Sequence, residues 1–288
     1  MHQIPFMVVM NIALRSLVVI GFLVQSGFVA AQNDSLPADD WDAYLAHFKK
    51  YPGSVSLNMA LKKVAPLSTY PYLVITGVKY SDCQSDGLPS RREFTNLYKI
   101  SDSINAVINR SARAVNAGSF TFQCERLEYF YVDDTTWIRH RLKLLYENRF
   151  NGYLPHTEIK KDSAWNTYTK FLYPKEETLE IMANQKIVSA LQRAGDNPAI
   201  ARNIDHWAYF KTEADRTCFI TTYLAKNRFA VTAKENTTSY PGYPFKVTFS
   251  RTDKPAVATI SKLTFTLRRQ AALCYGEYDG WETTVQVR

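Results

Sequence analysis

The spacing of apolar residues changes in the same order twice along this chain, and that order restricts the fold more than any single motif does. A period of two indicates a strand, and a period near 3.6 indicates an amphipathic helix. Both halves show strand, helix, strand, strand, helix, strand. In the first half the predicted elements are residues 72–80, 91–114, 120–124, 127–132, 136–148 and 153–160. In the second half they are residues 206–211, 212–226, 228–233, 245–251, 256–271 and 278–287.

This order is that of the ferredoxin-like split β-α-β arrangement, in which helices cover one face of an antiparallel sheet. A further hairpin is predicted before the first set, because turn residues at 51–53 precede an alternating segment at 54–58. We therefore expect an α+β protein of two ferredoxin-like (βαββαβ) domains in tandem, the first with an extra N-terminal hairpin. The domains would span residues 38–174 and 178–288, since Pro174 ends the first and an acidic cluster opens the next helix.

Residues 1–31 have the pattern of a signal peptide. Arg15 precedes an apolar run at 17–24, and the small residues Ala30 and Ala31 precede a polar Gln32. The run is too short to span a bilayer comfortably. We expect a periplasmic or secreted protein that has no membrane segment after cleavage. An uncleaved N-terminal anchor is the alternative, and Met10 is an alternative start.

Four cysteines allow three pairings. The first and second strands of a ferredoxin-like sheet run parallel, so the end of the first strand, before Cys83, lies near Cys124 at the end of the second. The two helices run antiparallel, which brings Cys218, early in one helix, near Cys274, after the other. The topology predicts disulfides Cys83–Cys124 and Cys218–Cys274. Four buried thiols are the alternative.

Signatures of common catalytic sites are missing from the sequence. It has no Gly-rich phosphate loop after a strand, no Gly-x-Ser-x-Gly and no zinc-ligand spacing, so we expect no cofactor and no metal. The best acid–base group is Asp205, His206 and Asp279, because the first and last strands are neighbours in this topology and a carboxylate beside a histidine raises its pKa. A structural hydrogen bond between the strands is the alternative interpretation. We expect a protein that is not an enzyme.

Charge gives no strong indication of a partner. The formal net charge is +8 and the sequence pI about 9.2, with the excess spread evenly over both halves, as on an ordinary solvated surface. RNA-recognition domains share this fold, but their Gly-containing strand motif is missing at residues 245–249. We expect no nucleic-acid partner.

Alternation assigns the faces of the second predicted sheet. The residues expected to face its helices are apolar: Phe229, Val231, Phe245, Val247, Phe249, Trp281, Val285 and Val287. The opposite face is polar except on the first strand, where either Trp207 and Tyr209, or His206 and Phe210, must point outward. Large aromatic side chains on a polar face are typical of a contact surface. We expect this face to bind a partner or to be covered by the N-terminal domain.

Three stretches of the second half, ALQRAGD (190–196), DHWAYF (205–210) and GEYDGWET (276–283), resemble the family of the protein inhibitor of ribonuclease E, regulator B (RraB). In the first half, GLPSRREF (87–94) and DSAWNTYTKFLYP (162–174) resemble the domain of unknown function 695 (DUF695). The first resemblance implies a bacterial protein that acts by binding a protein partner. Tyr278 and Trp281, in the third stretch, join Trp207 and Tyr209 as predicted binding residues, with a place in the core as the alternative for Trp281.

We therefore predict an exported, non-catalytic binding or regulatory protein whose partner is a protein of unknown identity. The signal peptide would separate it from ribonuclease E. If the prediction of a signal peptide is wrong, the alternative is a cytoplasmic inhibitor of ribonuclease E. A second alternative is an enzyme of unknown type that uses Asp205, His206 and Asp279.

Overall fold

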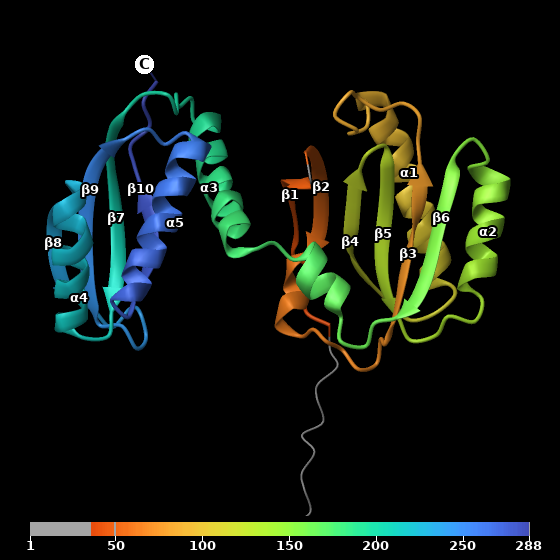
Figure 1. The fold of residues 1–288 in the computed structure, drawn as a ribbon, viewed down its shortest axis with the longest axis horizontal. Coiled ribbons are helices and arrows are strands. Elements are labelled where there is room, and N and C mark those ends of the chain that lie inside the picture. Colours follow the sequence, from red (N-terminus) through yellow and green to blue (C-terminus); the bar gives the residue numbers. More distant parts are fainter. Residues whose placement is uncertain (1–35, 49, 288) are drawn as a thin grey trace, which may run out of the picture. The chain divides into compact units, whose positions relative to one another are not determined.

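The computed structural model describes residues 36–48 and 50–287, so the predicted signal peptide lies outside the described residues. Within them the chain is mixed α+β, with an antiparallel six-stranded sheet and an antiparallel four-stranded sheet (Figure 1). The α+β class is as predicted. Each sheet with its helices is described by itself below.

The N-terminal half begins with a hairpin, as predicted, formed by β1 (Trp41–Phe48) and β2 (Tyr51–Asn58). The prediction that residues 51–53 form its turn is wrong, because they pair with β1 as the first residues of β2. The elements that follow are a short 3-10 helix, η1 (Met59–Lys63), then β3 (Tyr72–Lys79), α1 (Arg91–Asn109), β4 (Ala114–Phe122), β5 (Glu125–Val132), α2 (Ile138–Arg149), β6 (Leu154–Lys161) and a short π-helix, η2 (Thr167–Leu172). The strand order is β1-β2-β4-β5-β3-β6. The extra hairpin therefore extends the sheet beside β4, and β6 lies at the other edge.

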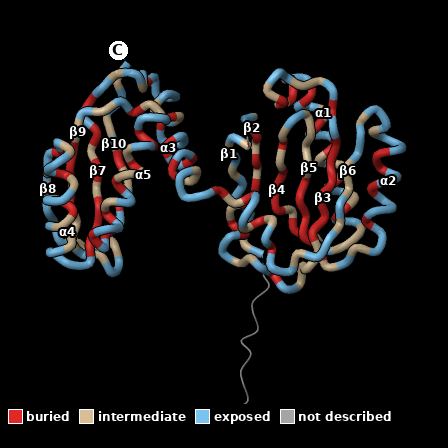
Figure 2. The backbone as a smooth tube through the Cα atoms, in the orientation of Figure 1, coloured by how far each residue is buried: buried red, intermediate tan, exposed pale blue. Residues whose placement is uncertain are grey.

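Both faces of the six-stranded sheet bury apolar side chains. In Figure 2 the inner strands of this sheet are mostly red, the colour of buried residues. Helices α1 and α2 cover one face, where residues such as Ile104 and Leu142 share a core with Phe130 of β5. On the other face, Trp165 stacks on Tyr131 with ring centroids 3.9 Å apart. Residues 162–172, whose structure periodicity alone did not predict, contribute much of this second layer, together with Leu61 and Leu67.

As far as residue 287, the C-terminal half contains three α-helices and four strands. Its elements are α3 (Glu176–Arg193), β7 (Arg202–Phe210), α4 (Glu213–Phe219), the short helices η3 (Ile220–Leu224) and η4 (Ala225–Asn227), β8 (Ala230–Asn236), β9 (Phe245–Asp253), α5 (Val257–Leu273) and β10 (Gly276–Glu282). The strand order is β10-β7-β9-β8. Strands β7 and β10 are thus neighbours, as the sequence predicted for the strands of His206 and Asp279.

Helices α3, α4 and α5 contribute to the cores on one face of this sheet. The predicted alternation of Phe245, Val247 and Phe249 toward these helices is confirmed by their common core. The prediction for Val285 and Val287 is wrong, because β10 ends at Glu282 and these two side chains are 40% and 70% exposed. The chain leaves the sheet before the alternation could continue.

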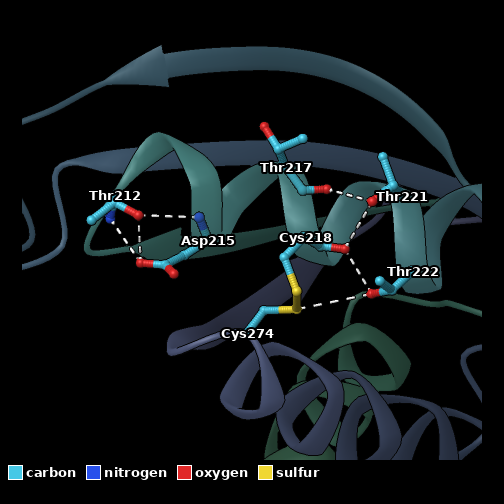
Figure 3. The surroundings of a disulfide bond; sticks show 7 residues. All are labelled: Thr212, Asp215, Thr217, Cys218, Thr221, Thr222 and Cys274. Carbon is cyan, nitrogen blue, oxygen red and sulfur yellow. Dashed lines mark hydrogen bonds between the residues drawn. A yellow bond between two sulfur atoms is a disulfide. The ribbon is translucent and has the colours of Figure 1, made fainter.

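Both predicted cysteine pairs lie at disulfide distance. The Cα atoms of Cys83 and Cys124 are 5.7 Å apart, and those of Cys218 and Cys274 are 5.9 Å apart. Figure 3 shows the second pair, which joins α4 to the end of α5. The predicted N-cap Thr212 begins α4, and its side chain and that of Asp215 form a reciprocal capping box (Figure 3).

Candidate functional site

The candidate site lies on the face of the four-stranded sheet opposite its helices, which we call the outer face. In β7, Ile204, His206 and Ala208 are buried toward the helices. Successive side chains of a strand point to opposite faces, so Trp207 and Tyr209 lie on the outer face. This is the first of the two arrangements that the sequence left open.

A hairpin loop between β8 and β9 adds two tyrosines to this face. The ring of Tyr240 stacks on Tyr209 with centroids 4.4 Å apart and an interplanar angle of 13°. Tyr243 meets Tyr240 edge-on at 5.8 Å. We refer to Trp207, Tyr209, Tyr240 and Tyr243 as the outer-face aromatics. Tyr209 is nearly covered, at 8% exposure, whereas the other three are half-buried and keep part of their rings accessible.

Carboxylates of β10 hold these aromatic side chains in place. The indole Nε1 of Trp207 donates to Asp279 Oδ2 at 2.7 Å, and the hydroxyl of Tyr240 donates to Glu277 Oε2 at 2.6 Å. The hydroxyls of Tyr240 and Tyr243 hold the pKa of Glu277 below its usual value, and the Glu277 carboxylate raises the pKa of Tyr240 to about 12. These hydrogen bonds and ring contacts therefore restrict the orientation of the outer-face aromatics.

A β-bulge explains how Asp279 reaches Trp207. The register of β10 against β7 shifts between Tyr278, which pairs with Ala208, and Gly280, which pairs with Trp207. Asp279 is the extra residue, and bulges commonly redirect a side chain in this way. The indole of Trp207 lies against Gly280, where a Cβ atom would be 3.6 Å from it.

The predicted acid–base group is not brought together. His206 is fully buried on the helix side, where its Nδ1 lies 2.9 Å from the Tyr278 hydroxyl. Burial, with a smaller contribution from Arg251, lowers the pKa of His206 to about 3. Asp279 instead bonds Trp207 on the outer face, and Asp205 accepts from Asn203 Nδ2 at 3.1 Å. The expected carboxylate–histidine contact is therefore wrong, because the alternation of β7 and the bulge of β10 send these side chains to opposite faces.

The four predicted binding residues also divide between the two faces. Trp207 and Tyr209 lie on the outer face, whereas Tyr278 and Trp281 are 1% and 5% exposed in the core. Trp281 donates from Nε1 to Asn184 Oδ1 at 2.6 Å. The alternative that the sequence left open for Trp281, a place in the core, is therefore the one that the structure has.

Tyr240 and Tyr243 were missed by the sequence reasoning. The signal is the repeated Tyr-Pro in the hairpin loop, at 240–241 and 243–244. Prolines make such a loop stiff, and tyrosine in a stiff loop is a common binding residue.

The described residues contain no group of three His, Cys, Asp or Glu side chains that could hold a metal ion. None of the helices in the described part of the chain is both long and apolar enough to cross a membrane.

The fold and the outer face define an α+β protein with a preformed aromatic surface. Residues 39–173 match the profile of a family of unknown function, DUF695, and residues 181–283 match that of the Regulator of ribonuclease activity B, RraB. The chain is thus similar to DUF695 in its N-terminal half and to RraB in its C-terminal half, as the sequence motifs predicted.

No curated protein matches this chain. One similar solved structure is of a candidate glycine cleavage system transcriptional repressor, with 10% identity, a TM-score of 0.23 and coverage of 74% of this chain and 98% of that one. Another is of an unknown protein from Galdieria sulphuraria, with 11% identity, a TM-score of 0.21 and coverage of 75% and 99%. Similarity this low carries no argument about function.

Proposed function

We propose that this chain is an exported, non-catalytic protein-binding protein whose C-terminal half contacts its partner through the outer face. The observation that carries the proposal is the group of half-buried aromatic rings, Trp207, Tyr240 and Tyr243, on an otherwise polar face. Aromatic residues are enriched at protein interfaces, and they bind best when their orientation is already fixed. The carboxylates of Glu277 and Asp279 supply that fixation through the two short hydrogen bonds to Tyr240 and Trp207.

We also propose that each half of the chain is a ferredoxin-like domain, the first at residues 38–174 and the second at residues 178–288. Numbered within each half, the strands β3 to β6 and β7 to β10 have the same spatial order, with the first and third strands central. This order supports the assignment. In the N-terminal half, the extra hairpin and residues 162–172 are additions to it.

Export is supported by the cysteines. Two pairs at disulfide distance fit an oxidising compartment, since cytosolic thiols are kept reduced. The match to RraB supports a protein partner, and the proposed export separates the chain from cytoplasmic ribonuclease. A cytoplasmic inhibitor of ribonuclease E is the alternative. Fractionation of a C-terminally tagged protein distinguishes the two, because export requires the tag outside the cytoplasm.

Comparative affinity capture from the native host tests the binding proposal. The wild-type chain should enrich a defined protein, and Trp207→Ala combined with Tyr243→Ala should reduce its recovery at least tenfold. The matched control is Leu273→Ala, which removes a 72% exposed apolar side chain from the end of α5, outside the outer face. All three proteins should have nearly equal melting temperatures, because the two aromatic side chains are only half-buried. Equal recovery by the double variant and the wild type would refute the proposal.

A further inference from the structure

A groove runs between α2 and β6 in the N-terminal half, at one edge of the six-stranded sheet. Within the described residues, β6 pairs with β3 alone, and α2 lies along its other side (Figure 1). The groove has a volume of about 620 Å³, within the ordinary range of ligand pockets. Its lining residues are Arg139, Lys143, Tyr146, Glu147, Asn151, Tyr153, Pro155 and Thr157. One wall is therefore a helix, and the other is the free edge of a sheet.

The backbone of β6 offers hydrogen-bonding groups to this groove. Arg139 Nη1 donates to the carbonyl oxygen of Thr157 at 3.2 Å, so that carbonyl points away from β3. In an antiparallel strand the N–H and C=O of one residue point to the same side, and alternate residues share that side. The N–H of Thr157 and the backbone groups of Ile159 therefore also face the free edge. Pro155 faces it too and has no N–H, which limits pairing to the C-terminal part of β6.

The side chains between the two walls are suited to an extended chain. Tyr146 forms the floor, and its hydroxyl is fixed 2.7 Å from Thr76 Oγ1, which also lies 3.0 Å from Thr157 Oγ1. Tyr153 and Pro155 give one end apolar surface. Along α2, Lys143 and Glu147 form an ion pair with Nζ 3.7 Å from Oε1, so the charge of Arg139 is the excess on this wall of the groove. This excess of positive charge complements an acidic side chain.

We infer that the groove binds an extended, acidic peptide segment of a partner protein by strand addition to β6. The peptide backbone would pair with Thr157 and Ile159, and every second side chain would enter the groove. A peptide N–H would replace Arg139 on the carbonyl of Thr157, and the released guanidinium would pair with a peptide carboxylate. This site is separate from the outer face and does not depend on the proposed function.

A displayed library of random nine-residue peptides, panned against the full chain, tests the inference. Selected peptides should be enriched in Asp and Glu. Arg139→Ala combined with Lys143→Ala should weaken their affinity at least tenfold. Arg141→Ala is the matched control on the same helix, because Arg141 donates to the carbonyl of Arg110 and does not line the groove. The affinity of the Arg141→Ala variant for the selected peptides should equal that of the wild type.

Backbone pairing is tested separately. Thr157→Pro removes the edge N–H and should abolish binding, whereas Thr157→Val removes only the hydroxyl and should retain it. Because the proline variant could be destabilised, a peptide N-methylated at alternate residues provides a second measurement on the wild-type chain. Methylation of the peptide N–H groups that point toward β6 should abolish binding. Methylation of the alternate N–H groups, which point away from β6, should leave binding intact. Binding that is insensitive to both registers, or a selection without any groove-dependent peptide, overturns the inference.

Discussion

Acidification should destabilise the C-terminal half through His206. This side chain is fully buried, and its pKa is about 3 in the folded state because burial disfavours the imidazolium. In the unfolded chain the pKa is near 6.5. Below that pH the unfolded state binds a proton that the folded state does not, so stability falls as pH decreases and continues to fall until the pH reaches the folded-state value.

The size of the effect follows from the two pKa values. Each pH unit between them costs about 1.4 kcal/mol. The loss from this one group is about 2 kcal/mol at pH 5 and approaches about 5 kcal/mol below pH 3. A domain with a typical stability of roughly 5–15 kcal/mol would lose a large share of it. Among titratable groups, the Tyr278 hydroxyl, whose pKa burial raises, contacts His206 and Arg251 acts on it, and neither is a carboxylate that would stabilise the imidazolium.

Urea unfolding at pH 7 and pH 5 measures the loss, with His206→Asn as the comparison. Asparagine keeps a polar atom near Nδ1 and does not titrate, so contributions from carboxylates cancel between the two proteins. The wild type should lose about 2 kcal/mol more than the variant over this range. Equal losses, or an NMR titration that gives His206 a pKa above 6, would show that the imidazole is not as desolvated as its burial indicates.

Three further predictions concern a disulfide, a buried ion pair and the cleavage of the signal peptide. Replacing Cys218 and Cys274 by Ser opens a link across 56 residues, and urea unfolding should show a loss of about 2–4 kcal/mol. Asp196→Ala removes the carboxylate 2.7 Å from the buried Arg202 guanidinium and leaves that charge only neutral acceptors, so the free energy of unfolding should fall by about 3–5 kcal/mol, and a loss below about 1 kcal/mol would contradict this. Mass spectrometry of the native protein should find a mature N-terminus at or near Gln32, and an uncleaved terminus in the cytoplasm would contradict export.

Local signals in the sequence were sufficient to predict much of the fold. Thr212 followed by acidic residues predicted the start of α4, and Ser90 predicted that of α1, where its side chain accepts from the N–H of Glu93 at 3.2 Å. The alternation from Phe245 to Phe249 fixed the buried face of β9. These features depend on neighbours within a few residues, which a sequence displays directly.

Other features depend on contacts that periodicity does not reveal. Trp165 packs on Tyr131 from a segment that ends in a π-helix, and a π-helix has neither a period of two nor one of 3.6. Tyr240 joins the outer face because a loop folds back onto Tyr209, far away in sequence. The predicted contact of His206 with Asp279 failed for the same kind of reason, since a bulge is invisible to a simple alternation rule.

The bulge at Asp279 has a consequence for how related sequences could diverge. Tyr278 and Trp281 remain opposite Ala208 and His206 only because Asp279 is outside the regular pairing. A deletion of this one residue would restore an ordinary ladder without moving either core side chain to the other face. It would remove the acceptor that orients Trp207. Loss of this residue in a related sequence would therefore alter the outer face and leave the pairing of the core side chains as it is.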